Sequence, residues 1–328
     1  ADEVIFGRDY EASLSVLHNV QNYENSTTMG RPGMNKKIVN SYLMADGSRF
    51  TDKAGYETMT FEQECQNRDP RLAQTIRTPG YTRIGSTKKE APNLAYTMTG
   101  YHLIKYSMTA NYDEYNKSCN DIPLFRTAEV YLNFAEAKAE LITLKQADIN
   151  KSIKLLRDRV GMTNLDMELA NSKPDPYLMS AATGYPNVKG ANQGVILEIR
   201  RERTIELVME GFRYYDIMRW KEGKLFENDL LGIYVPGPGT YDLDKDGTDD
   251  VCFYVGTKPA GNVPLYLEIG EQIRLSNGES GYIICHSLST KKWNEDRDYL
   301  YPVPISERTL SNGVITQNPG WNDGLNFN

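Results

Sequence analysis

Glutamates recur at a regular spacing in residues 195–220, and pairs of carboxylates can act as acid and base on a glycosidic bond. Glu198, Glu202, Glu206 and Glu210 are four residues apart, so on an α-helix they lie along one face. Like charges at that spacing repel one another, whereas the two carboxylates of a glycosidase face each other across a cleft. The pattern therefore predicts a scaffold helix held by ion pairs. The arginines expected to compensate the glutamates are Arg200, Arg201, Arg203, Arg213 and Arg219.

A second group of carboxylates lies in residues 241–250, with the sequence YDLDKDGTDD, and could bind calcium. Alternating acidic residues ahead of Gly247 follow the order of ligands at the start of a calcium loop. The pattern fails at its twelfth position, where Phe253 replaces the expected glutamate. A solvated Asp-Gly hairpin turn explains the same residues, so both interpretations stay open. No cofactor is required, and calcium would be a structural clip. The candidate ligands are Asp242, Asp244, Asp246, Thr248 and Asp250.

Composition and charge argue against several other kinds of site. The net charge is −7, and no basic run interleaved with aromatic residues suggests a nucleic-acid partner. Four cysteines form no CxxC pair and three histidines are isolated, so a zinc or thiol-redox site has little support. No apolar run approaches the roughly 18 to 20 residues that span a bilayer. Tyrosine is abundant, with 22 residues against 9 phenylalanines, and suits contact with half-polar ligands such as sugars.

The predicted elements form one mainly α-helical domain over residues 1–328. Helical hairpins are expected at 122–161 and 195–225, and helix-turn-helix units of this kind are typical of tetratricopeptide-like superhelices. A loop-rich region, 1–121, precedes them, and 226–328 combines loops and short strands with an extended tail. The stripe predicted to be buried in the first hairpin is Ala128, Leu132, Ala135 and Ala139.

The end of the chain is expected to cross the helices without forming a helix itself, because Pro302 and Pro304 interrupt helical hydrogen bonding. Tyr299, Tyr301 and Trp321 would attach this tail to the helical body. The other end begins without an initiator methionine, a signal segment or a lipid-attachment cysteine, which indicates a mature or truncated chain.

Several ordered motifs make the chain resemble the SusD/RagB family of glycan-binding lipoproteins. FRTAEVYLNFAEA and EGFRYYDIMRW look like the family's helical signatures, and QNPGW looks like its ending. Each motif alone is weak, but their common order is specific. The matching segments are residues 3–6, 69–72, 125–137, 149–162, 200–220, 300–304 and 317–321.

The resemblance implies a SusD-like fold, with long loops and a few short strands, that corresponds to the middle and C-terminal portions of the family. It also implies a function without catalysis. The family captures oligo- or polysaccharides at the cell surface for nutrient uptake and delivers them to a SusC-like TonB-dependent transporter. By resemblance, the protein belongs at the outer membrane as a lipoprotein in a polysaccharide utilisation system, held by an N-terminal lipid anchor that this chain does not contain.

Sugar binding needs flat aromatic faces beside polar groups that pair with hydroxyls, and the loops of 1–121 offer both. Two alternatives to glycan binding stay open. A tetratricopeptide-type scaffold would bind protein in a concave groove, and an acidic glycoside hydrolase would release reducing ends. The candidate glycan-binding residues are Phe50, Tyr56, Tyr81 and Tyr96, with Arg49, Asp52, Asn67 and Arg83 beside them.

Overall fold

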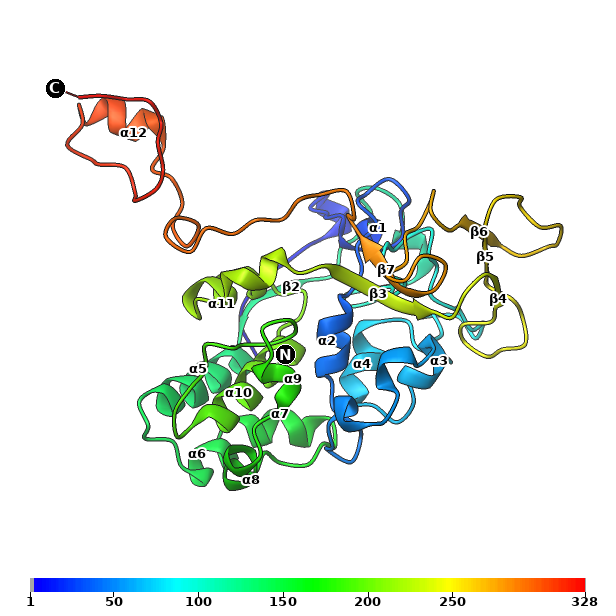
Figure 1. Cartoon of the computed structure of the whole chain (residues 1–328), viewed down its shortest axis with the longest axis horizontal. Helices are drawn as coiled ribbons and strands as arrows, with labels where there is room; N and C mark the ends of the chain where they lie inside the picture. Colours follow the sequence, from blue (N-terminus) through cyan, green and yellow to red (C-terminus); the bar gives the residue numbers. More distant parts are fainter. Residues whose placement is uncertain (1–2, 328) are drawn as a thin grey trace.

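The computed structural model describes residues 3–327 and is mainly helical, with a few short strands (Figure 1). This confirms the predicted fold class at that level. The helices are α1 (Val20–Glu24), α2 (Lys36–Ser41), α3 (Phe61–Glu64), α4 (Pro70–Thr75), α5 (Thr127–Glu140), α6 (Gln146–Asn150), α7 (Ile153–Arg159), α8 (Met167–Ser172), α9 (Pro176–Met179), α10 (Gln193–Glu206), α11 (Arg213–Arg219) and α12 (Ile305–Leu310). The strands are β1 (Val4–Arg8), β2 (Ile122–Arg126), β3 (Leu230–Val235), β4 (Gly239–Tyr241), β5 (Val251–Tyr254), β6 (Leu265–Glu268) and β7 (Gly281–Cys285).

One core lies between α5, α7, α8 and α10. Small residues let the helices approach closely, and the predicted stripe on α5 is confirmed, since Ala128, Leu132, Ala135 and Ala139 are all nearly inaccessible. Gly194 shows how close the approach is. A Cβ atom there would lie 1.9 Å from the carbonyl oxygen of Ala170 at α8. Only glycine fits this contact.

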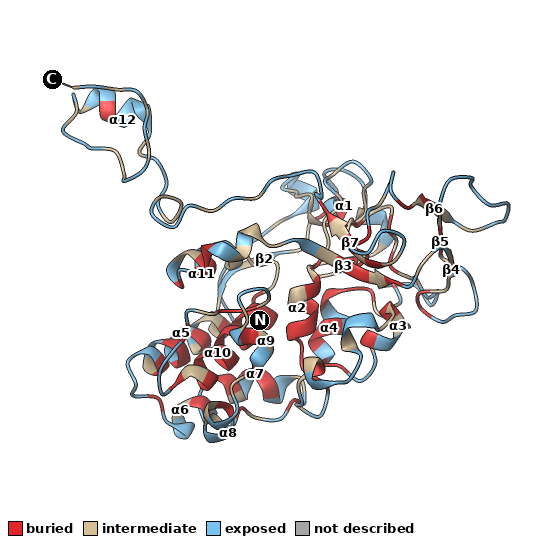
Figure 2. Cartoon of the chain, in the orientation of Figure 1, coloured by how far each residue is buried: buried red, intermediate tan, exposed pale blue. Residues whose placement is uncertain are grey.

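A second core joins α2, α3 and α4 to the strands. β3 pairs with β7 in an antiparallel ribbon, while β5 pairs antiparallel with β4 and parallel with β6. Val39, Phe61, Ile233 and Phe253 belong to this cluster. Figure 2 shows buried residues along α10, α5 and α2 and few of them in the C-terminal segment. The first strand, β1, pairs antiparallel with β2 just before α5 begins.

Helix α10 is buried along nearly its whole length although it is highly charged, because guanidinium groups from distant segments meet its glutamates. Glu202 accepts from Arg71 Nη1 at 2.5 Å and from Arg157 Nε at 2.8 Å. Glu206 accepts from Arg126 Nη1 at 2.7 Å and from Arg159 Nη2 at 2.8 Å. The predicted network of ion pairs therefore exists.

The predicted partners within this network are mostly wrong. Arg201 alone among the five expected arginines forms a described ion pair with one of the four glutamates, Glu198. Glu210 lies beyond the end of α10, in the turn before α11, and still pairs with Arg126 and Lys105. Arg200, Arg203 and Arg219 pair instead with Glu222, Asp216 and Glu136.

The C-terminal segment extends away from the helical body, so the prediction that it crosses the helices is wrong (Figure 1). Among the described residues, its contacts to the helical body come from its start. The Tyr299 hydroxyl accepts a backbone N–H of Gly223 at 3.0 Å, and the Tyr301 ring packs against that of Tyr214. Trp321 donates to Leu300 within the segment itself. A short helix, α12, begins directly after the two prolines, where a preceding proline does not disturb it. None of the described helices is long and apolar enough to cross a membrane.

Candidate functional site

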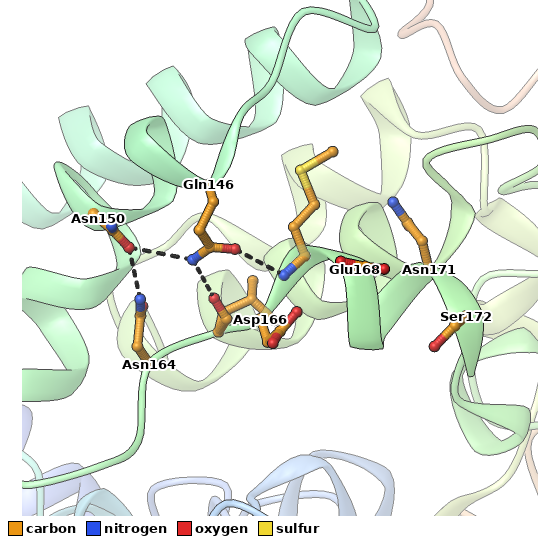
Figure 3. A pocket seen from close by; sticks show the side chains of 9 residues that line it. Gln146, Asn150, Asn164, Asp166, Glu168, Asn171 and Ser172 are labelled. Carbon is orange, nitrogen blue, oxygen red and sulfur yellow. Dashed lines mark hydrogen bonds between the residues drawn. The ribbon is translucent and has the colours of Figure 1, made fainter.

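An open pocket of about 960 Å³ lies beside α6, α8 and the loop that connects α7 to α8. Its wall carries a preformed network of side-chain amides (Figure 3). Gln146 Nε2 donates to the carbonyl oxygen of Leu165 at 2.8 Å, and Asn164 Nδ2 donates to Asn150 Oδ1 at 2.7 Å. Because these bonds fix the amides in place, they present donors and acceptors to a ligand without further ordering.

A second cavity of about 340 Å³ adjoins the first and shares Asn164, Leu165 and Asp166 with it. We call the two together the polar cleft. The second cavity ends at the turn that contains Ser48 and Arg49 and at the buried Arg157. Within the part of the chain that the structure describes, Arg157 Nη2 and Asn164 Oδ1 are buried without a hydrogen-bond partner. One is a donor and the other an acceptor, and neither is open to solvent.

Arg49 connects the polar cleft to a group of tyrosines. Its Nε lies 3.8 Å from Asp175 Oδ2, and its Nη2 donates to the carbonyl oxygen of Lys173. Asp175 caps α9 by accepting the backbone N–H of Tyr177 at 2.8 Å. The ring of Tyr177 meets that of Tyr56 edge to face, with centroids 6.4 Å apart. Two of the predicted residues, Arg49 and Tyr56, are therefore brought to one place.

The tyrosine group has four members, Tyr56, Tyr177, Tyr234 and Tyr282. Tyr234 and Tyr282 meet edge to face at 5.8 Å across the β3–β7 ribbon, and the Tyr282 hydroxyl donates to the carbonyl oxygen of Glu57. All four are half-buried, and burial raises the pKa of Tyr177 and Tyr282. Our sequence reasoning missed three of the four. The abundance of tyrosine was the one feature of the sequence that pointed to them. No local pattern could link them to Tyr56, because α9 and the ribbon lie far from it in sequence.

The other predicted residues near this turn differ in accessibility. Phe50 is 1% exposed and lies under the guanidinium of Arg68, whose carbon is 3.8 Å from the ring centroid. Phe50 therefore has no open face for a sugar, which corrects its assignment as a binding residue. Asp52 and Asn67 are exposed, and Asn67 lies beside the turn because its carbonyl oxygen accepts the backbone N–H of Ala45.

The remaining predicted residues form a separate cluster. Tyr81 lies under the Arg77 guanidinium at 5.4 Å, and Tyr96 meets His102 at 6.0 Å. Arg83 is buried and bonds to Asp113 and to the carbonyl oxygen of Met108, so it is occupied within the fold and its assignment is also corrected. The described contacts join this cluster to Arg77 and His102. They do not join it to Arg49 or Tyr56.

The acidic loop brings together three of its five candidate ligands. Carboxylate oxygens of Asp242, Asp244 and Asp250 lie within 4.8 Å of one another, close enough to bind a common calcium ion. Asp246 is turned to the loop backbone, where it accepts the N–H of Thr248 at 2.8 Å. Burial, together with the neighbouring carboxylates, raises the pKa of Asp250 to about 6. These carboxylates fit a cation, and calcium binding stays a prediction.

The fold and the polar cleft together define a mainly helical protein with a site suited to binding. A family model described as the SusD family matches residues 2–321, and the chain belongs to this family. The resemblance inferred from the motifs is thereby confirmed.

Solved structures agree with this fold. A SusD-like carbohydrate binding protein from Bacteroides fragilis is 21% identical with a TM-score of 0.59, and covers 94% of this chain and 53% of its own. A SusD-like protein from the same organism is 20% identical with a TM-score of 0.57, and covers 97% of this chain and 54% of its own. The chain thus spans about half the length of these solved relatives. A search of curated proteins found no match.

Proposed function

We propose that the protein is a non-catalytic cell-surface glycan-binding protein that delivers oligo- or polysaccharides to a SusC-like TonB-dependent transporter. The observation that carries the proposal is the junction at Arg49 between the polar cleft and the tyrosine group. Tyrosine rings stack on the C–H faces of sugars, and fixed amides pair with hydroxyls. Membership in the SusD family supports the transporter partner and a lipid-anchored position at the outer membrane. It also supports tetratricopeptide-like pairing of the helices.

The electrostatics of α10 favour binding over hydrolysis. A glycosidase needs one carboxyl group held protonated beside a second that is ionised. Burial alone would raise the pKa of Glu206, but the guanidinium groups of Arg159, Arg126 and Arg71 outweigh it and lower the pKa to about 2. The pKa of Glu202 is lowered in the same way by Arg71 and Arg157. These carboxylates stay ionised and paired, so they hold the fold.

Affinity electrophoresis against plant, microbial and host polysaccharides tests the proposal, with reducing ends assayed in parallel. We expect retention by at least one glycan class without product release. Tyr56→Ala should weaken retention at least tenfold because it removes the ring that meets Tyr177 edge to face within the tyrosine group. Tyr115→Ala is the matched control, since Tyr115 is an exposed tyrosine outside the site.

Three outcomes would contradict the proposal. Release of reducing ends would favour the hydrolase. Absence of binding to every glycan, together with capture of a peptide in the helical region, would favour a tetratricopeptide-type scaffold. Equal loss of retention in Tyr56→Ala and Tyr115→Ala would indicate that the glycan does not bind at Arg49.

A further inference from the structure

We infer that the polar cleft selects neutral, hydroxyl-rich saccharides and rejects glycans that carry carboxylate or sulfate groups. This inference rests on the proposed function and specifies its ligand class. It follows from two independent features of the cleft, the distribution of charge on its wall and the chemistry of its unpartnered polar atoms.

The cations of the cleft are already paired within the fold. Arg157 donates from Nε to Glu202 at 2.8 Å and from Nη1 to the carbonyl oxygen of Thr163 at 3.2 Å. Arg49 interacts with Asp175 and a backbone carbonyl, as described above. An acidic glycan would therefore meet no guanidinium or ammonium group that is free of a carboxylate partner among the described residues of the wall.

The carboxylates of the cleft are not compensated to the same degree. Glu198 pairs with Arg201 at 3.0 Å, but Asp46, Asp166 and Glu168 form no ion pair within residues 3–327. Figure 3 shows Asp166 between the amide network at one end of the pocket and Glu168 with Asn171 at the other. The wall is thus negative where a ligand would lie, and a ligand anion would be repelled by charges of its own sign.

A ligand group that both accepts and donates hydrogen bonds would satisfy the two unpartnered atoms. Arg157 is 3% exposed, and its Nη2 offers an N–H, while Asn164 Oδ1 offers a lone pair. Both residues line the same cavity. Both atoms are buried, so a small movement of the cavity wall must expose them before neighbouring hydroxyls of a sugar can accept from one and donate to the other. A carboxylate or sulfate ester accepts only, so it would leave Asn164 Oδ1 unpaired and add charge beside Asp166.

The amide wall supports the same ligand class. Asn171 Oδ1 accepts the backbone N–H of Val195 at 2.8 Å, which leaves its amide nitrogen as a donor at the pocket. Gln146 Oε1 accepts the backbone N–H of Met167 at 3.0 Å, which fixes the orientation of that amide. Oriented amides recognise the positions of hydroxyl groups and carry no charge to attract an anion.

The test compares each neutral polysaccharide with its own oxidised form. Glucan, mannan and galactan are used before and after conversion of the C6 hydroxyls to carboxylates, so that backbone and linkage stay the same. Binding to the full chain is measured by affinity electrophoresis and calorimetry at low ionic strength. We expect the neutral form of the preferred glycan to bind at least tenfold more tightly than its oxidised form. Half-molar salt should narrow this ratio because it screens charge.

Two variants probe the cause of the selectivity. The double variant Asp166→Asn, Glu168→Gln should narrow the ratio of neutral to oxidised affinity at least fivefold, and Asn164→Ala should weaken binding of the neutral glycan at least fivefold. Asp158→Asn is the control, since Asp158 is an exposed carboxylate outside both cavities. It should leave the ratio unchanged.

The outcomes separate the two claims. Equal or tighter binding of the oxidised glycan would overturn the inference and leave the proposed function standing. If the double variant left the ratio of affinities unaltered and Asn164→Ala left the affinity for the neutral glycan unaltered, the glycan would bind outside the polar cleft, which also overturns the inference alone. Failure of every glycan in the panel, neutral and oxidised, would overturn the proposed function and the inference with it.

Discussion

Two groups of carboxylates in this protein have opposite surroundings. On α10, Glu202 and Glu206 are buried, but each bonds to guanidinium groups from several other elements, and the pKa of Glu206 falls to about 2. In the acidic loop, Asp244 and Asp250 face each other and Asp242, and burial with mutual repulsion raises the pKa of Asp250 to about 6. Residues of one chemical kind thus serve the fold in the first group and remain available to a ligand in the second.

The difference lies in the source of the compensating charge. Arg71, Arg126, Arg157 and Arg159 come from three separate segments, α4, β2 and α7, and converge on α10, so they hold those segments together. The acidic loop is short and closes on itself, and no ion pair to its three clustered aspartates is present among the described residues. A cation from solution would be the missing counter-charge there.

The strongest test of this comparison removes a shared carboxylate from α10. Glu202→Ala should lower the free energy of unfolding by about 3 to 5 kcal/mol because it leaves Arg71 and Arg157 buried with less compensation. Urea unfolding followed by circular dichroism measures the change. Asp158→Ala breaks the exposed pair with Lys154 and should cost under about 1 kcal/mol. Equal costs for the two variants would show that the arginine network does not stabilise the fold.

A second test uses a buried carboxylate that cations approach without bonding to it. Glu24 Oε2 accepts from the Ser107 hydroxyl at 2.8 Å, while its Oε1 has no partner among residues 3–327. Burial raises the pKa of Glu24 to about 8 and outweighs the opposing effects of Ser107, Arg83 and Arg77. The folded protein therefore takes up a proton between pH 4.5 and 8, and stability should fall as the pH rises through that window.

Glu24→Gln mimics the protonated form and should remove this dependence. At pH 9 the variant should be more stable than the parent by on the order of 2 kcal/mol, while at pH 5 the two should differ little. Thermal unfolding across this range measures both. Glu62→Gln, on the partly exposed surface of α3, serves as the control and should leave the pH dependence intact. An unchanged slope in Glu24→Gln would mean that Glu24 is ionised in the fold.

Local pattern explains what could be predicted of the fold. The stripe on α5 follows from helical periodicity within one segment, and so does the position of the charged helix. The partners of Glu202 do not, because Arg71 lies 131 residues away in sequence and no local spacing indicates that distance. The C-terminal segment was placed wrongly for the same reason. Its prolines restrict the conformation of its own backbone, but they do not indicate where the segment lies relative to the helices.

The site was predictable only in part. Residue type and loop position led to Arg49 and Tyr56, which lie together, but the same criteria also selected Phe50 and Arg83, which are buried. Accessibility depends on what the rest of the chain packs over a loop. The amides of the polar cleft were missed because Gln146 and Asn150 lie within the first predicted hairpin, while Asn164 and Asn171 lie between the two predicted hairpins. Their significance appears only when α6 and α8 come together.

The smallest expected effect concerns the acidic loop and completes the comparison. We predict that calcium binds Asp242, Asp244 and Asp250 and supplies the charge that arginines supply on α10. At a free calcium concentration tenfold above Kd, binding should stabilise the protein by about 1.4 kcal/mol, measured as a rise in Tm over the same sample in chelator.

Asp244→Asn should abolish the rise in Tm. Asp249→Asn should retain it, since Asp249 is exposed and lies outside the cluster. If calcium raised the Tm of parent and Asp244→Asn alike, the ion would bind elsewhere, and the loop would be a hairpin turn whose carboxylates are relieved by protons and water alone.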